Sequence, residues 1–437
     1  MGVKLYIITV AVLIIFHDAE SESISDDIRN HLGSKTPYRF KYLKDDSKIK
    51  FPGCESTKMW MVIRHGSRLP SDEDIADMNT TLKEFSQQIL SGHKVGKGQL
   101  TKEQLSRFAN WSSSIDITKE KDLVDEGRDE MTQLAKRMHK RFPSIIKSKY
   151  NSDTYEFRST PTERAVESAK SFAIGLFDKS APKVIITKTG KGDPVLRFYK
   201  HCDNWQKQVK KNPNTYAEQK KLGNSLLMNQ TLEQITQKLG LDNTIDLAAA
   251  GLMYKACAFE TAWWKGYVAP WCFAFDKNTI KVLEYYYDLK HYLMDGYGNE
   301  LTSQTACESV KNMFEHLTSK TGPNASFLFA HSGTLLKILT HMGLYKPESP
   351  LTGDYIPEDS VWRLSEIDCF ASNLAFVLLE CKDGHHILTL HQERVVRLPA
   401  CEKELCPLDR LKQVFHDTIH NCDHAAICKY NSSNDEL

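Results

Sequence analysis

The sequence predicts an α/β fold with a mainly parallel central sheet, flanking helices and a helical lid formed by insertions. Short apolar runs rich in β-forming residues recur along the chain, among them "KMWMVIR" at 58–64 and "SFLFA" at 326–330. Amphipathic stretches with helical spacing lie between such runs. Alternating strands and helices are typical of a domain built on a parallel sheet with helices on its faces.

Several segments are predicted to be strands, because each is short, apolar and rich in β-forming residues. The run at 58–64 is apolar almost throughout, which is typical of a strand that is buried on both faces. The predicted strands are 58–64, 183–187, 326–330, 374–380 and 386–396.

Helices are predicted where apolar side chains recur every three or four residues. In 123–142 these side chains are Met131, Leu134, Met138 and Phe142. Residues 161–177 begin with Pro161, a favoured first-turn residue, and place small and apolar side chains on one helical face. The segments 303–318 and 335–343 are also predicted to be helical.

The chain contains no repeat, low-complexity tract or Pro/Ser-rich linker, so residues 24–402 are predicted to form one α/β domain. Two stretches, near 73–120 and 201–250, are more polar and are helical where they are patterned. We expect them to be insertions that form the lid. Residues 403–437 are charged, and we expect a helical tail closed by a small disulfide loop between Cys422 and Cys428.

The N-terminus is predicted to be a signal peptide that spans residues 1–19. One lysine precedes an apolar stretch from Leu5 to Phe16, which is too short to cross a bilayer, and small residues follow it. No later segment is apolar for long enough to cross a membrane. We therefore expect no membrane span after signal cleavage.

Eleven cysteines and five N-x-[ST] sequons agree with an oxidising, glycosylating compartment. The odd number of cysteines predicts a free thiol or a bond to another chain. Cys54 and Cys381 flank the first strand and a late one, and we expect them to pair. The sequons are at Asn79, Asn110, Asn229, Asn324 and Asn431.

The last four residues, "NDEL", resemble the address that a receptor reads for retrieval to the endoplasmic reticulum, although Asn434 replaces the usual lysine. Behind a signal peptide, this motif predicts residence in the lumen of the endoplasmic reticulum, with the retrieval receptor as a partner. Secretion is the alternative.

The overall charge does not point to a polymeric partner. The chain has 57 basic and 56 acidic residues and a formal net charge of +1, so nothing global favours nucleic acid or a membrane surface. An anionic ligand would need a local concentration of positive charge.

The apolar run at 58–64 ends in a motif that suits a phosphoryl group. Arg64 and His65 come where the strand ends, Gly66 allows a sharp turn, and Arg68 follows. Ligands of α/β sheets bind beyond the carboxyl ends of strands. Arginine binds phosphoryl oxygens bidentately, and histidine can attack phosphorus. The motif therefore predicts a phosphorylated small molecule as the ligand. It implies no metal or other cofactor, because arginines repel cations and the motif contains no Cys-x-x-Cys or paired-histidine spacing.

Arg-His alone could be a polar strand end, but the full Arg-His-Gly-x-Arg-x-Pro is far more specific. It resembles the motif of the histidine phosphatase superfamily, in its acid phosphatase and phytase branch. "FRSTPTERAVES" (157–168) and "FLFAHSGTLL" (327–336) are similar to two further segments of that branch. More narrowly, the chain resembles the multiple inositol polyphosphate phosphatases of the branch. The segments that carry this narrower resemblance are 270–298, 350–355, 371–381 and the final "DEL".

The resemblance extends from about residue 35 to the end and implies a phosphoglycerate mutase-like α/β fold. It also implies that His65 attacks phosphorus, forming a phosphohistidine that water hydrolyses. The groups that would neutralise the phosphoryl oxygens are Arg64, Arg68, Arg158 and the second catalytic histidine, His331. Arg164, behind Arg158, and Lys35, in the lid, are further candidates for phosphate contacts.

The chain departs from the family at the general acid. The acid phosphatases and phytases carry an aspartate directly after the second histidine, and the inositol polyphosphate enzymes carry His-Ala-Glu. This chain has His331-Ser332-Gly333, and neither Ser332 nor Gly333 can act as a general acid. The loss of such an acid costs about 10²–10⁴-fold in rate.

Three interpretations remain open. A carboxyl from elsewhere replaces the acid; the enzyme is restricted to substrates with good leaving groups; or the chain has lost catalysis and binds phosphorylated ligands without turning them over. Phosphoryl transfer between hydroxyls, as in the mutase branch, is disfavoured by the signal peptide. The carboxyls considered as replacements are Asp72, Glu73, Asp74 and Glu163.

Overall fold

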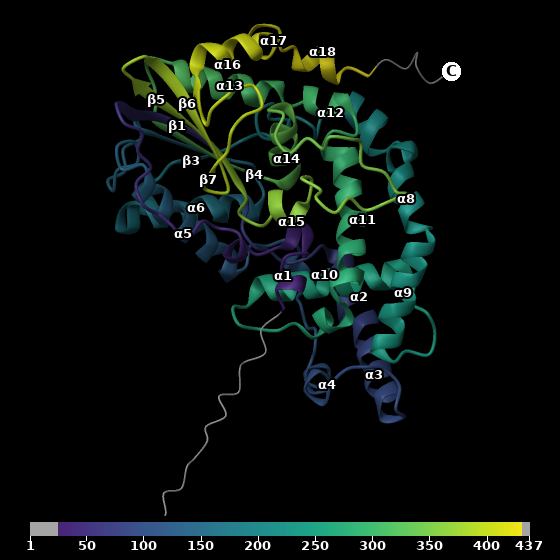
Figure 1. Ribbon diagram of the computed structural model, residues 1–437. Helices are drawn as coiled ribbons and strands as arrows, with labels where there is room; N and C mark the ends of the chain where they lie inside the picture. Colours follow the sequence, from purple (N-terminus) through teal and green to yellow (C-terminus); the bar gives the residue numbers. More distant parts are fainter. Residues whose placement is uncertain (1–24, 431–437) are drawn as a thin grey trace, which may run out of the picture.

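An eight-stranded mixed sheet lies in the upper left part of the computed structural model, which describes residues 25–430 (Figure 1). The predicted signal peptide, the sequon at Asn431 and the terminal "NDEL" lie outside the described residues. The strands follow the order β3-β2-β4-β1-β5-β6-β7, and β8 pairs with β6. Their bounds are β1 Cys54–Arg64, β2 Tyr155–Ser159, β3 Ile186–Lys188, β4 Ala325–Ala330, β5 Asn373–Cys381, β6 Gly384–His391, β7 Arg394–Val395 and β8 Leu405–Pro407.

The predicted fold class is confirmed, with parallel pairing in the core of the sheet. Strands β3, β2, β4 and β1 are parallel neighbours, whereas β5 to β8 extend the sheet with antiparallel pairings. Strand β5 runs back along β1 and pairs Asn373 with Ile63. The loop that precedes β5 therefore lies next to the carboxyl end of β1.

The described residues also form eighteen α-helices. Those before the long central helices are α1 Asp26–Arg29, α2 Asp72–Asn79, α3 Thr81–Lys94, α4 Lys102–Ala109, α5 Asp125–Arg141, α6 Glu163–Phe177, α7 Asp203–Trp205, α8 Ala217–Gly223 and α9 Leu226–Leu239. The others are α10 Leu247–Trp263, α11 Lys277–Asp295, α12 Glu300–Gln304, α13 Cys307–Thr318, α14 Ser332–His341, α15 Leu364–Ile367, α16 Leu408–Val414, α17 His416–His420 and α18 His424–Cys428.

Strand β1 is buried between two layers of helices, and its side chains alternate between them. Met59, Met61 and Ile63 belong to one core with the inner faces of α5 and α6. Trp60 and Val62 belong to the other core, which includes residues of α13 and α14. Successive strand residues point to opposite faces, so a strand covered on both sides must be apolar at nearly every position.

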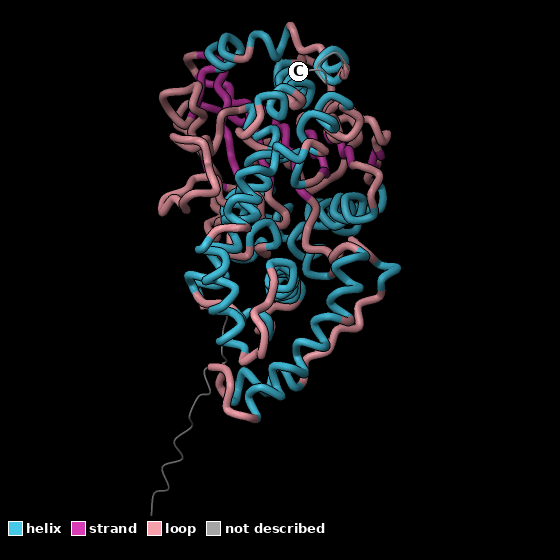
Figure 2. The backbone as a smooth tube through the Cα atoms, turned by 90° about the vertical axis from the view of Figure 1, so that its right-hand side faces the viewer, coloured by secondary structure: helices cyan, strands magenta, loops and turns pink. Residues whose placement is uncertain are grey.

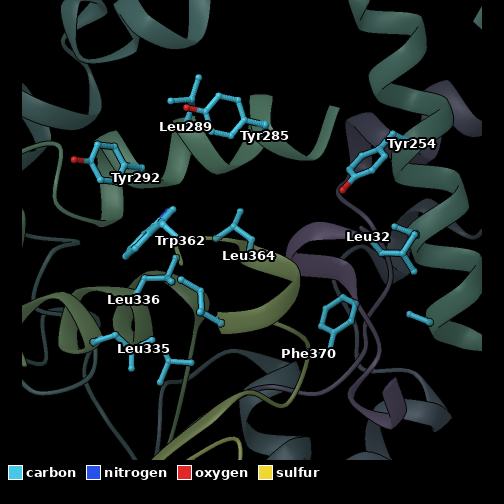
Figure 3. Packing of buried hydrophobic residues seen from close by; sticks show 14 of the residues in the cluster. Leu32, Tyr254, Tyr285, Leu289, Tyr292, Leu335, Leu336, Trp362, Leu364 and Phe370 are labelled. Carbon is cyan, nitrogen blue, oxygen red and sulfur yellow. The ribbon is translucent and has the colours of Figure 1, made fainter. Parts of the chain in front are cut away.

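Both segments predicted to be insertions are helical, and with α10 and α11 they form a helical region beside the sheet. Figure 2 shows the strands in the upper part of the molecule and this region mostly below them. Figure 3 shows how the two parts share one core, because Tyr292 of α11 lies close to Trp362, near Leu335 and Leu336 of α14. Phe370, in the loop before β5, belongs to the same core. The helical region is thus packed onto the edge of the sheet that carries the sequence motifs.

Five disulfides and one free, buried thiol, Cys369, account for all eleven cysteines. The predicted Cys54–Cys381 bond and the predicted free thiol are confirmed. The predicted loop between Cys422 and Cys428 is wrong, because α17 packs on α13 and α18 packs on α7, so that each cysteine faces a distant partner. The remaining bonds are Cys202–Cys428, Cys307–Cys422, Cys257–Cys272 and Cys401–Cys406. Among the described residues, no helix is long and apolar enough to cross a membrane.

Candidate active site

Two histidines meet at the carboxyl ends of adjacent parallel strands. His65 follows β1 and His331 follows β4, and the pairing of Arg64 with Ala330 brings the two strand ends level. The ring centroids of His65 and His331 lie 5.6 Å apart, with an angle of 64° between the rings. The structure therefore brings together the two histidines that the sequence motifs singled out.

The hydrogen bonding of His65 leaves one ring nitrogen available as a nucleophile. Its Nδ1 lies 2.9 Å from the carbonyl oxygen of Gly66, which can only accept, so Nδ1 carries the proton and Nε2 presents its lone pair. Burial lowers the pKa of His65 well below its ordinary value, and the charges of Arg164 and Arg64 lower it further. The imidazole is thus neutral at physiological pH, as a nucleophile must be.

The turn after His65 is fixed by its contact with helix α5. A Cβ atom on Gly66 would lie 2.4 Å from the carbonyl oxygen of Gly127, so the close approach of the two backbones requires glycine. One residue further, the backbone N–H of Ser67 donates to Glu130 Oε2 at 2.7 Å, and the Ser67 hydroxyl donates to Oε1 at 3.0 Å. These contacts set the direction in which the His65 side chain leaves the strand.

Four arginines form a cluster with unused donors around the histidines. Within residues 25–430, the Nε atoms of these arginines and Nδ1 of His331 are buried and have no hydrogen-bond partner. Buried donors are normally satisfied, so an unsatisfied group of this kind indicates a site for an acceptor-rich anion. Burial, together with the charges of Arg164 and Arg64, lowers the pKa of Arg68 to about 9. The four arginines are Arg64, Arg68, Arg164 and Arg197.

Aromatic rings and helix α10 hold two of these arginines in place. The guanidinium carbon of Arg64 lies 4.9 Å from the ring centroid of Phe370, and that of Arg68 lies 5.6 Å from Phe259 of α10. Trp263, also in α10, donates its indole N–H to the carbonyl oxygen of Arg68 at 3.0 Å. The helical region therefore covers the end of the nucleophile loop.

The second histidine is in a similarly basic environment. Its Nε2 lies 3.0 Å from Thr160 Oγ1, which comes directly after β2. Burial lowers the pKa of His331 well below its ordinary value, with Arg164 and Arg197 as the next causes. His331 is therefore also neutral, and it is placed to contact an anion bound at His65.

Lys35 lies close enough to the arginine cluster for its charges to act on the lysine ammonium group. Burial and the charges of Arg68 and Arg64 lower its pKa to about 7, and Lys255 of α10 adds to this effect. The position of Lys35 is thus consistent with the phosphate contact expected from the sequence.

Arg158 lies in a different environment. Its side chain forms an ion pair with Asp193 at 3.0 Å, and its strand position pairs with Leu328 in β4. Arg164 lies six residues later, at the start of α6. Its charge lowers the pKa of both His65 and His331 more than any other charge does. The structure thus brings Arg164, rather than Arg158, to the histidines.

The structure adds Arg197 to the set, a residue that the sequence analysis did not single out. It lies in an irregular segment between β3 and α7, and its charge acts on Arg164 and His331. No local motif marks it. The signal available from sequence is only an arginine that follows the turn-forming stretch 188–194.

The four candidate replacement acids are either exposed on the surface or ionised. Asp72 and Glu73 are exposed at the start of α2. Burial would raise the pKa of Asp74, but its hydrogen bond and ion pair with Lys255, at 2.6 Å, hold that pKa below the ordinary value. Glu163 is exposed and accepts the N–H of Leu123 at 2.9 Å. None of the four contacts either histidine in the described structure.

A cavity of about 1140 Å³ lies away from these histidines, and neither His65 nor His331 lines it. Its walls carry charges of both signs, including Lys281, Arg363 and Asp288. The positive charge is therefore concentrated at the strand ends and not in this cavity.

The fold and site together define a phosphoryl-handling α/β protein, with two histidines at adjacent strand ends inside a cluster of arginines. A match to the Histidine phosphatase superfamily (branch 2) spans residues 57–398. Multiple inositol polyphosphate phosphatase 1 of Drosophila melanogaster is 32% identical over 390 residues, which cover 85% of this chain and 82% of the relative. The chain therefore belongs to branch 2 of the histidine phosphatase superfamily, as a histidine acid phosphatase of the multiple inositol polyphosphate phosphatase type.

Solved structures share the fold. The phytase from D. castellii superposes with a TM-score of 0.74 at 15% identity, over 93% of this chain and 88% of the phytase. The multiple inositol polyphosphate phosphatase of Bifidobacterium longum, solved in complex with inositol hexasulfate, has a TM-score of 0.66 at 14% identity, over 93% of this chain and all of the other (100%). The central sheet and the helical region are thus both features of this fold.

Proposed function

We propose that the protein hydrolyses the phosphomonoesters of inositol polyphosphates through a phosphohistidine at His65. The observation that carries the proposal is the group of buried, unsatisfied donors around the two histidines. Such donors stabilise an anion whose charge grows during reaction, because they are already oriented when the charge develops.

The proposed reaction has two steps. Nε2 of His65 attacks phosphorus, the bond from phosphorus to the inositol oxygen breaks, and that oxygen leaves with a proton. Water then attacks the phosphohistidine, which releases inorganic phosphate and restores His65. Arg64, Arg68, Arg164 and His331 hold the phosphoryl oxygens in both steps.

The substrate class rests on the relatives. The Drosophila relative is named for inositol polyphosphates, and the Bifidobacterium relative was solved with a hexasulfate analogue. A substrate with several phosphates needs positive charge beyond the reacting group. Lys35 is placed to supply it, because Arg68, Arg64 and Lys255 all lie near enough to lower its pKa.

Phosphate release from inositol hexakisphosphate and from an aryl phosphate, with His65→Ala beside the wild type, tests the proposal. Wild-type turnover of both substrates that is lost in His65→Ala is the expected result. His316→Ala is the matched control and should remain active, because His316 contacts the backbone of Met59 and Asn324 at the opposite end of β1 and β4. Turnover that survives in His65→Ala contradicts the proposed nucleophile.

A second function, binding of phosphorylated ligands without turnover, is favoured by one observation. Position 333 carries no carboxyl group, and the space beside it is lined by Tyr199 and Asp295. A protein with this function would bind inositol hexakisphosphate tightly in calorimetry, would lose that binding in Arg164→Ala, and would release no phosphate from either substrate.

Five disulfides indicate passage through the secretory pathway. Residence in the lumen of the endoplasmic reticulum is our further proposal, supported by residues 434–437. Deletion of these four residues should move the protein from cell lysate to medium. An unchanged distribution would count against retrieval.

A further inference from the structure

Asp368 is a buried carboxyl group that the antiparallel course of β5 brings to the candidate site. It follows α15 and precedes β5, whose first residue pairs with Ile63 near the end of β1. Its side chain is completely buried, at 0% exposure. A residue far away in sequence thus lies next to the nucleophile strand.

Asp368 makes polar contacts with both sequence motifs. The hydroxyl of Ser332, the residue after His331, donates a hydrogen bond to Asp368 Oδ2. Arg64 Nη1 lies 3.4 Å from the same oxygen and donates to the backbone carbonyl of Asp368. The other carboxyl oxygen, Oδ1, is buried and has no hydrogen-bond partner within residues 25–430.

Ser332 occupies the position at which acid phosphatases of this branch are expected to carry their general acid. A carboxyl group hydrogen-bonded to the Ser332 hydroxyl is therefore one hydrogen bond away from that position. Ser332 is half-buried, whereas Asp368 is fully buried. Only the hydroxyl is placed to meet a ligand, with the carboxyl behind it.

We propose that Asp368 supplies the proton for the leaving oxygen, delivered through the hydroxyl of Ser332; this inference rests on the proposed phosphatase function. With Asp368 protonated on Oδ2, the same contact is reversed, because the carboxyl O–H donates to Ser332 Oγ and the serine hydroxyl turns its hydrogen towards the ligand. As the bond between phosphorus and the leaving oxygen breaks, that oxygen takes the proton of the Ser332 hydroxyl. Ser332 takes the proton of the Asp368 carboxyl, which becomes a carboxylate. When water attacks the phosphohistidine, the water's proton returns along the same path and restores the carboxylic acid.

Burial favours the protonated form of Asp368, although most of the neighbouring groups oppose it. Burial raises the pKa of Asp368 above its ordinary value, against the opposing effects of Arg64, on β1, and of the Ser332 hydrogen bond, on α14. From α11, His291 also lowers this pKa and Asp295 raises it. The net direction is the one a general acid requires, since the proton must still be present at the working pH.

Asp295, the other buried carboxyl nearby, is not suited to this task. Its ion pair with Lys337 and its hydrogen bond to His291 at 2.7 Å outweigh burial and hold the pKa of Asp295 well below its ordinary value. Asp295 therefore remains a carboxylate with no proton to give.

The test compares two leaving groups in Asp368→Asn. For inositol hexakisphosphate, whose leaving oxygen needs a proton, kcat/KM should fall by about 10²–10⁴-fold. For an aryl phosphate, which leaves readily without one, the fall should stay within about tenfold. Asp288→Asn is the matched control, because Asp288 is equally buried, also has a raised pKa and lies in α11 away from the histidines. It should change neither value.

The pH profile and two further variants complete the test. In the wild type, kcat/KM for inositol hexakisphosphate should fall as rising pH deprotonates Asp368, and this limb should disappear in Asp368→Asn. Ser332→Ala, which keeps the carboxyl group but breaks the path, should show the same selective loss. Ser332→Asp in the Asp368→Asn background should recover activity on inositol hexakisphosphate, because it returns a carboxyl to the site.

The outcomes separate this inference from the proposed function. If the wild type cleaves neither substrate, the phosphatase function fails and the inference fails with it. The wild type can instead be active through His65 while Asp368→Asn and Ser332→Ala lower kcat/KM equally for both substrates, or for neither. In that case only the inference is overturned. If Asp368→Asn loses its cooperative thermal unfolding transition, Ser332→Ala decides the matter. A loss of kcat/KM for inositol hexakisphosphate alone supports the inference, and an equal loss for both substrates overturns it.

Discussion

Asp295 and Lys337 form an ion pair in the interior, directly beside Gly333. A Cβ atom at position 333 would lie 3.3 Å from Asp295 Oδ1 and 3.2 Å from the ring of Tyr199. The space where the family's acidic side chain would begin is therefore bordered by an anion. An acidic side chain at position 333 of α14 would therefore lie beside the carboxylate of Asp295 in α11.

Gly333→Glu should not increase phosphatase activity, although it restores the family's residue. The new side chain would begin in close contact with Tyr199 and would add a second negative charge beside Asp295. We expect unchanged or lower kcat for inositol hexakisphosphate, and a lower melting temperature, since overpacking costs about 1–3 kcal/mol. Gly333→Ala is the control for the contact alone. A gain of activity in Gly333→Glu would show that the acid had simply been lost.

Lys337→Met should destabilise the protein by about 3–5 kcal/mol, because it leaves the Asp295 carboxylate buried without its cation. Lys337 is 0% exposed, and its ammonium group also lies 4.5 Å from the ring of Tyr199. Lys97→Met, which breaks an exposed pair with Asp242, should cost at most about 1 kcal/mol. Urea unfolding of both variants makes the comparison.

The ion pair of Asp295 with Lys337 predicts how the stability of the protein depends on pH. The pKa of Asp295 is lower in the folded protein than in the unfolded chain, so the unfolded state binds the proton more readily. The stabilisation is complete above the ordinary aspartate range, near pH 4, and is lost as pH falls below it. The difference between wild type and Lys337→Met should therefore shrink at low pH. A difference that stays constant from pH 7 to pH 3 would contradict this assignment.

The sequence predicted the site where it is built from local motifs. His65 and His331 could be found because each directly follows an apolar run, and such runs form strands wherever both faces are covered. Strand β2 was missed, because Glu156 and Arg158 interrupt its apolar pattern. Its extended form depends on parallel hydrogen bonds to β4, which no local pattern reports.

The rest of the site depends on the course of the chain in space. Asp368 lies at the site only because β5 runs antiparallel to β1, a pairing that the prediction of a mainly parallel sheet did not specify. Arg197 lies in an irregular segment whose path follows from packing rather than from residue spacing. Arg158 and Arg164 both fit the motif, and the choice between them requires the direction in which β2 and α6 point their side chains.

That choice can be tested directly. Arg164→Ala should lower kcat/KM for an aryl phosphate by about 10²–10³-fold, the usual cost of one donor to a developing oxyanion. Arg158→Ala should lower it only a few-fold, because its partner is Asp193 and it is not among the leading causes of either histidine's pKa shift. Steady-state kinetics of the two variants, with thermal melts as a control for folding, separates them. Equal losses would place Arg158 in the site after all.

The pH dependence of the nucleophilic step should reflect the low pKa of His65. Burial and the neighbouring arginines keep the folded-state pKa of His65 well below the ordinary value near 6.5, so Nε2 remains unprotonated as pH falls through that value. With an aryl phosphate, whose leaving group needs no acid, kcat should stay nearly constant from pH 7 to below pH 6. Arg164→Lys keeps the positive charge and should preserve this plateau, whereas Arg164→Ala should move the acidic limb to higher pH, because a charge that lowers the pKa of His65 is gone. Rate profiles measured at constant ionic strength would reveal the shift. An acidic limb near pH 6.5 in the wild type would mean that the arginines do not act on His65 as their positions indicate.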